Sequence, residues 1–279
     1  MENKIGIMQG RLSPSINNRI QAFPKNNWSD EFEIANSIGF STLEWVFDSY
    51  ENPILNPEKL SEIKKISKES SIEINSVCAD YFMEKKLFGE SEESLNQNLD
   101  VLFKLIKNCH EIGIPIVEIP LVDESSISNI NDQKDFEINL ETITSNIKNY
   151  NITIALETDL EPHRLENLIS KINHPKIKLN YDVGNSTANK FNMEEEFKLL
   201  HKWITNIHIK DRLSGNHTVP LGKGNVNFDY FFKILRQKNY EGDLIIQGAR
   251  EDLTNNKISP IETSEKYLEF VNQYLDKYQ

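Results

Sequence analysis

The sequence has few cysteines and no long apolar run. Its 279 residues include two cysteines, Cys78 and Cys109. They lack the spacing of a disulfide framework, so we expect free thiols and a reducing compartment. No apolar run approaches the roughly 20 residues of a membrane-spanning helix, and the mean hydropathy is −0.52. Segment 1–5 lacks the apolar region of a signal peptide. We therefore expect a cytoplasmic protein that does not enter a membrane.

Positive charge is also scarce. Lysine and arginine total 31 against 43 aspartates and glutamates, which gives a formal net charge of −12 and a pI of about 5.1. Proteins that bind nucleic acid need basic surface to neutralise phosphates, so the balance argues against a nucleic-acid partner. It argues equally against anionic membrane surfaces. A small phosphorylated substrate stays compatible with it, because a local cluster of cations and backbone N–H groups is sufficient.

Short β-branched segments alternate with amphipathic ones along the whole chain. We expect strands at 5–8, 42–47, 72–77, 116–119, 152–157, 177–182, 206–209 and 244–247. We expect helices at 29–38, 57–69, 91–112, 132 or 134 to 149, 162–172, 193–204, 227–239 and 264–277. Regular strand–helix alternation predicts a parallel sheet. About eight such units predict an α/β fold, a (β/α)8 TIM barrel, as one domain over residues 1–279.

A doubly wound open sheet is the alternative architecture. It would gather its polar residues at one switch point of the sheet. Here polar residues follow nearly every expected strand, and no Gly-x-Gly-x-x-Gly motif follows the first one. Both observations favour the barrel.

The phase of the last four strands directs polar side chains to one face. In segment 206–212, isoleucines alternate with His208 and Lys210, so the two polar side chains point to the same side. In the same way Glu157, Asp182 and Gln247 end their strands pointing inward. Two carboxylates, an imidazole and an amide oxygen form a mixed ligand set. Such a set suits Mn²⁺, Mg²⁺, Co²⁺ or Zn²⁺.

Several segments resemble one known family. They are Leu156-Glu157-Thr158-Asp159, Tyr181-Asp182-Val183-Gly184-Asn185, His208-Ile209-Lys210-Asp211, Leu221-Gly222-Lys223-Gly224 and Asn239-Tyr240-Glu241-Gly242. In this order they are similar to the sugar phosphate isomerase/epimerase family of xylose isomerase-like TIM barrels. The resemblance covers the second half of the chain by motif and the first half by architecture. Members often form dimers or tetramers, so it also implies a homo-oligomer.

The resemblance implies a metal held by Glu157, Asp182, His208 and position 247, where the family has a second glutamate. This chain has Gln247, whose amide oxygen ligates more weakly than a carboxylate and cannot act as a base. The two-glutamate acid–base pair of the family's ketose epimerases is therefore incomplete. One carboxylate base, Glu157, remains beside Lys210.

We therefore expect a metal-dependent isomerase or epimerase of a small sugar or sugar phosphate. The reaction would proceed through an enediol(ate), with Glu157 as base and Lys210 as a second catalytic residue. Further strand-end residues are candidates for substrate binding: Arg11, Glu118, Arg212 and Arg250. Glu118 is also a candidate second acid–base partner, together with Glu44, Asp80 and Asp211.

Three other functions stay open at this point. The same metal site could serve a dehydratase or other lyase acting on a keto-sugar. Because of Gln247, the barrel could also have lost catalysis and bind a sugar or a partner protein. An abasic-site endonuclease, a related barrel, needs more histidines than the six present and a basic groove. We interpret Gly222-Lys223-Gly224 as turn residues, because the run is too short for a phosphate-binding loop.

Overall fold

The computed structural model describes residues 3–215, 217–253 and 258–278, and within them eight parallel strands form a closed barrel. The barrel strands are β1 (Ile5–Met8), β2 (Thr42–Val46), β3 (Glu73–Cys78), β4 (Ile116–Leu121), β5 (Thr153–Thr158), β6 (Ile177–Asp182), β7 (Ile204–Ile209) and β10 (Asp243–Ile246). Each strand pairs with its neighbour in sequence order, and β1 also pairs with β10, which closes the ring. The predicted (β/α)8 TIM barrel is confirmed.

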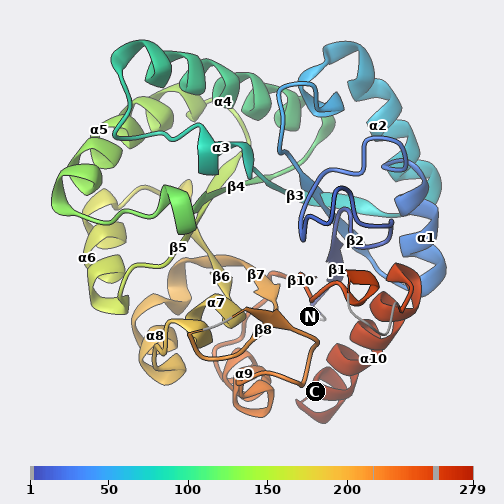
Figure 1. The fold of residues 1–279 in the computed structure, drawn as a ribbon. Helices are drawn as coiled ribbons and strands as arrows, with labels where there is room; N and C mark the ends of the chain where they lie inside the picture. The colour runs from blue at the N-terminus through green and yellow to red at the C-terminus, as the bar shows by residue number, and fades with distance from the viewer. Residues whose placement is uncertain (1–2, 216, 254–257, 279) are drawn as a thin grey trace.

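Helices surround these strands on all sides (Figure 1). They are α1 (Asp30–Ile38), α2 (Pro57–Ser70), α3 (Tyr81–Glu84), α4 (Glu92–Ile112), α5 (Ile130–Ile147), α6 (Pro162–Ile172), α7 (Val183–Ala188), α8 (Met193–Leu200), α9 (Phe228–Gln237) and α10 (Pro260–Tyr278). In Figure 1, α10 lies beside α1, so helices from the two ends of the chain complete the outer ring. Among the described residues, no helix combines the length and apolar character that crossing a membrane requires.

Local sequence signals set most helix ends. Gly39 and Gly113 follow α1 and α4 in the left-handed conformation, with φ of 107° and 91°, as expected for helix-ending glycines. The Ser91 side chain accepts a hydrogen bond from Ser94 N at the start of α4. Ser29 precedes α1 without such a side-chain bond.

Three element boundaries differ from the prediction, one because of strand pairing and two because of local signals at the helix start. Strand β7 begins at Ile204, which pairs with Leu179 of β6, so α8 ends at Leu200 and not at 204. Helix α5 starts at Ile130, because Asn129 caps it by accepting hydrogen bonds from the next backbone amides. Helix α10 already begins at Pro260, a residue suited to a first helical turn.

Several small elements absent from the sequence prediction lie at the carboxyl ends of the strands, among them a helix and a hairpin. Helix α7 directly follows β6, and a hairpin of β8 (Asp211–Arg212) and β9 (Thr218–Val219) follows β7. Both belong to the βα loops of the barrel, and α7 contacts β8. Active sites of TIM barrels lie at this face.

Candidate active site

His208 is the centre of the polar groups inside the barrel. The side chain is wholly buried on β7. Its Nε2 donates to Glu44 Oε2 at 2.6 Å and lies 3.1 Å from Glu118 Oε2, and its Nδ1 lies 3.5 Å from Glu157 Oε2. Burial alone would lower the pKa of His208, but the carboxylates of Glu118 and Glu44 raise it well above its ordinary value.

Glu44 on β2 orients this imidazole. Its Oε1 accepts hydrogen bonds from Ser76 Oγ at 2.5 Å and from Asn206 Nδ2 at 2.9 Å, which leaves Oε2 for His208 Nε2. This contact orients the ring so that Nδ1 lies 3.5 Å from Glu157 Oε2 and 3.1 Å from Asn180 Nδ2. A metal ion that replaced the proton on Nδ1 would therefore be bound on the side of Glu157.

Glu157 at the end of β5 is nearly buried, with 5% of its surface exposed. Its Oε1 accepts a hydrogen bond from Asn185 Nδ2 at 2.6 Å, and Asn180 Nδ2 lies 3.4 Å from its Oε2. Burial alone would raise the pKa of Glu157, but the contact with His208 and its positive charge outweigh burial and lower the pKa. Glu157 is therefore a carboxylate at neutral pH.

Asp182 and Lys210 form an ion pair beside Glu157. Asp182 Oδ2 lies 2.9 Å from Lys210 Nζ, and Asp182 Oδ1 accepts a hydrogen bond from Asn185 N as the cap of α7. Burial alone would lower the pKa of Lys210, but Asp182 and Glu157 raise it. Lys210 is thus a cation. Gly184 leaves room for it, because a Cβ at that position would lie 2.8 Å from Lys210 Cγ.

Gln247 follows β10 and is bound to a residue of the loop after β1. Its Nε2 donates to Gln21 Oε1 at 3.0 Å and lies 3.2 Å from Met8 Sδ, whereas its Oε1 is buried without a hydrogen-bond donor. Gln21 in turn donates to Asp80 Oδ2 at 2.6 Å. This chain of amides ties the end of the last strand to the loops after β1 and β3.

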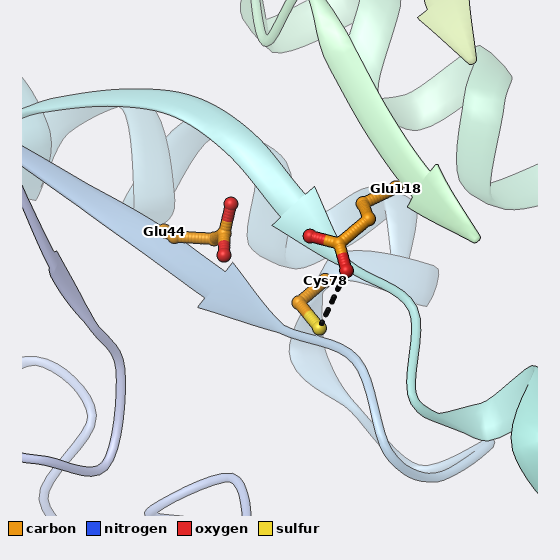
Figure 2. A group of neighbouring side chains, drawn as sticks. All are labelled: Glu44, Cys78 and Glu118. Atoms are coloured by element: carbon orange, nitrogen blue, oxygen red, sulfur yellow. Dashed lines mark hydrogen bonds between the residues drawn. The ribbon is translucent and has the colours of Figure 1, made fainter. Parts of the chain in front are cut away.

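Ligand atoms of the described residues come together in two groups that share Glu118. One consists of Glu118, Glu157 and His208, and the other of Glu44, Cys78 and Glu118; within each, the ligand atoms lie within 4.8 Å of one another. Figure 2 shows the second group, whose side chains project toward one another from three adjacent strands. Burial raises the pKa of Glu118 well above its ordinary value, and His208 opposes the effect.

The donor set fits a divalent cation. Three carboxyl groups, those of Glu44, Glu118 and Glu157, surround a single imidazole. Glu118 Oε2 and Gln247 Oε1 are buried oxygens without hydrogen-bond donors. Buried carboxylates require compensating positive charge, and oxygen and imidazole ligands suit Mn²⁺, Mg²⁺, Co²⁺ or Zn²⁺.

The three arginines expected to bind substrate have protein partners. Arg11 donates to the carbonyls of Ile20 and Gly248, and Arg250 donates to those of Gly10 and Ser13 and also pairs with Asp252; these contacts are 2.5–3.2 Å long. Arg212 is half-buried on β8 and donates to Asn185 Oδ1 at 2.8 Å. Of the three, Arg212 is the one linked to the groups around Glu157.

Sequence reasoning did not assign a site role to Asn185, Asn206 or Gln21. Asn206 lies two residues before His208 and therefore faces the same side of β7, a signal that strand alternation provides. Asn185 completes the Asp-Val-Gly-Asn run after β6. Gln21 lies in the long loop after β1, where no periodic pattern predicts a direction.

Known proteins share this architecture. The family model described as the xylose isomerase-like TIM barrel matches residues 32–273. L-ribulose-5-phosphate 3-epimerase UlaE of Escherichia coli is 25% identical over 236 residues, which cover 79% of this chain and 81% of the epimerase.

Solved structures agree with this match. IOLI protein with a binding zinc atom has a TM-score of 0.80 at 16% identity and covers 99% of both chains. D-psicose 3-epimerase of Clostridium cellulolyticum H10 with D-tagatose has a TM-score of 0.76 at 14% identity, over 98% of this chain and 99% of that one. The chain therefore belongs to the xylose isomerase-like TIM barrel family, and within it to the sugar phosphate isomerase/epimerase group.

Proposed function

We propose that this chain is a divalent-metal-dependent isomerase or epimerase of a small sugar or sugar phosphate. The observation that carries the proposal is the contact between Glu157 and His208 at the catalytic end of the barrel. A relative along most of the chain is named as a sugar-phosphate epimerase, which supports the same class.

Glu157 is the base in this proposal. It removes the proton from the carbon next to the substrate carbonyl and yields an enediolate. Its lowered pKa keeps it ionised, and the amide of Asn185 holds Oε1 in place. General-base catalysis of this kind contributes about 10²–10⁴-fold.

Lys210, the cation next to Glu157, stabilises negative charge on the substrate and does not remove protons. Lys210 remains protonated beside Asp182, so it is suited to hydrogen-bond a substrate oxygen that becomes negative. Arg212, linked to the same Asn185, lies where it could bind a hydroxyl or phosphate group. Glu157 and His208, with further oxygen ligands, would hold the proposed metal, which would supply a Lewis acid for the substrate carbonyl.

Gln247 supports a second candidate. Its amide cannot return a proton, and it is engaged with Gln21. With one carboxylate base, removal of water next to a carbonyl is also chemically consistent, so a dehydratase or other lyase on a keto-sugar is the alternative. A barrel that only binds sugar is the third.

The proposal is tested with the purified chain, stripped by a chelator and then supplied with Mn²⁺, Mg²⁺, Co²⁺ or Zn²⁺. A panel of free and phosphorylated ketoses and aldoses is analysed by NMR. We expect metal-dependent formation of an epimer or isomer. A product that has lost one water, either a hydroxy-enone or its dicarbonyl tautomer, would establish the lyase. Sugar binding without turnover in any metal would establish the binding protein, and equal turnover in the stripped protein would overturn metal dependence.

A further inference from the structure

Glu118 is a buried carboxyl group inside the barrel, whereas position 247 has none. In this chain the position directly after the last barrel strand offers only the amide of Gln247, and that amide is bound to Gln21 and Met8. Strand β4, which pairs with the strand of Glu157, instead carries the carboxyl group of Glu118 into the barrel. β4 and β5 are register neighbours, with Glu118 next to Ala155 and Pro120 next to Glu157.

The position of Glu118 is that of a ligand. Its side chain is wholly buried. Its Oε1 is 3.7 Å from the thiol of Cys78, a long and weak contact, and its Oε2 has no hydrogen-bond donor although it lies 3.1 Å from His208 Nε2. A buried carboxyl oxygen without a hydrogen-bond donor costs free energy, and a cation between Glu118, Glu157 and His208 would supply the missing partner.

We propose that Glu118 binds the divalent cation together with Glu157 and His208, so that the metal site uses β4 where the family resemblance implies the last strand. The inference rests on the metal dependence proposed above and names a ligand for it. The ligand atoms of the three residues lie within 4.8 Å of one another. The amide of Gln247 is instead hydrogen-bonded to Gln21.

The competing group of Glu44, Cys78 and Glu118 is less suited to a cation. Both oxygens of Glu44 already accept short hydrogen bonds from Ser76, Asn206 and His208. The thiol of Cys78 donates to Asp80 Oδ1 at 3.1 Å. A cation there would displace these partners, whereas Glu118 Oε2 accepts no hydrogen bond and lies 3.1 Å from His208 Nε2, a residue of the proposed site.

The test is a Co²⁺ titration of the full-length stripped protein, followed by calorimetry and by visible and near-ultraviolet absorption. Wild type is compared with Glu118→Gln, Gln247→Ala and Cys78→Ser. We expect one Co²⁺ per wild-type chain and a Kd at least about tenfold weaker in Glu118→Gln, since losing even an outer partner of a ligand costs that much. Gln247→Ala and Cys78→Ser should keep the wild-type Kd. Circular dichroism confirms folding. If Glu118→Gln does not fold, Glu118→Asp, which withdraws the carboxylate by one methylene, should show the weaker Kd.

Each other result would overturn a defined part of the proposal. Equal Kd values for wild type and the Glu118 variants would refute the role of Glu118 and leave metal dependence intact. A thiolate-to-cobalt absorption band that Cys78→Ser abolishes would place the ion in the competing group. Weaker Co²⁺ binding in Gln247→Ala but not in Glu118→Gln would show that Gln247, and not Glu118, is the metal ligand. A wild type that binds no Co²⁺ would overturn this inference and the metal dependence of the proposed function together.

Discussion

Asp211 holds the loop beside the candidate active site, and Asp211→Asn tests how strongly. The side chain is buried at the start of β8. Its Oδ2 accepts the backbone N–H groups of Gly222 at 3.0 Å and Gly224 at 2.8 Å, and its Oδ1 accepts that of Val226 at 3.2 Å. A Cβ at Gly224 would lie 2.1 Å from Oδ1, so the glycine permits this close approach.

The expected loss follows from these three bonds. A hydrogen bond to a charged acceptor contributes roughly 1.5–3 kcal/mol and one to a neutral acceptor roughly 0.5–1.5 kcal/mol. In Asp211→Asn, two bonds lose the charge, and the new NH₂ group faces the N–H of Val226, so the third bond is lost. We expect the free energy of unfolding to fall by about 3 kcal/mol, a large part of the roughly 5–15 kcal/mol typical of a folded domain.

Urea denaturation of wild type and Asp211→Asn measures this difference, with equal m-values as evidence of the same transition. Asp229→Asn is the matched control. That carboxylate is 54% exposed and pairs with Lys277 at the surface, so its loss should leave the unfolding midpoint unchanged. A decrease below about 1 kcal/mol in Asp211→Asn would refute the view that charged hydrogen bonds hold the loop.

Three further predictions concern pH, packing and the metal. Burial, opposed by hydrogen bonds from Ser186 and Tyr181, raises the pKa of Glu196 from 4.5 to about 7. Because the folded protein favours the protonated acid, the stability that Glu196 contributes is complete below pH 4.5 and is lost as the pH rises to 7. Urea titrations across that range should show Glu196→Gln gaining about 3 kcal/mol relative to wild type, and parallel pH profiles would contradict this origin. Gly184→Ala should displace Lys210 and cost about 1–3 kcal/mol in urea denaturation; an unchanged midpoint would show that Lys210 moves freely. Chelation should lower the melting temperature and Mn²⁺ should restore it, whereas a temperature insensitive to both would argue against a bound ion.

Strand alternation predicted which side chains meet, but loop geometry decided their partners. Glu157, Asp182 and His208 end neighbouring strands with the same phase, and the barrel places Asp182 in register with His208. The period of two and the closure of the sheet are enough for that result. Gln247 has the same phase, yet its amide donates a hydrogen bond to Gln21 in a long loop. No sequence pattern predicts such a contact.

The arginines illustrate the same limit. Arg11 and Arg250 follow strands, as anion-binding residues often do, and their positions at the catalytic end were predictable. In the structure their guanidinium groups instead satisfy backbone carbonyls of the loops after β1 and β10. Which carbonyls need a donor depends on the loop conformation, because buried polar groups must be paired, and that conformation is not encoded in a periodic signal.

The turn interpretation of Gly222-Lys223-Gly224 is confirmed and has a physical reason. Gly222 has a φ of +78°, a backbone conformation that residues with a side chain rarely adopt. Its N–H and that of Gly224 donate hydrogen bonds to Asp211 Oδ2. The glycine motif thus supplies backbone donors to Asp211, three residues after His208, so segments 208–211 and 222–224 are joined by hydrogen bonds.

The most direct measurement for the whole account is solvent exchange at the carbon next to the substrate carbonyl. The metal-loaded protein is incubated in D₂O with free and phosphorylated ketoses, including L-ribulose 5-phosphate, and deuterium incorporation is followed by NMR. Wild type and the exposed control Glu124→Gln should exchange at the same rate, and Glu157→Gln should exchange at least about 100-fold more slowly while remaining folded. Exchange at the wild-type rate in Glu157→Gln would contradict the assignment of Glu157 as the base.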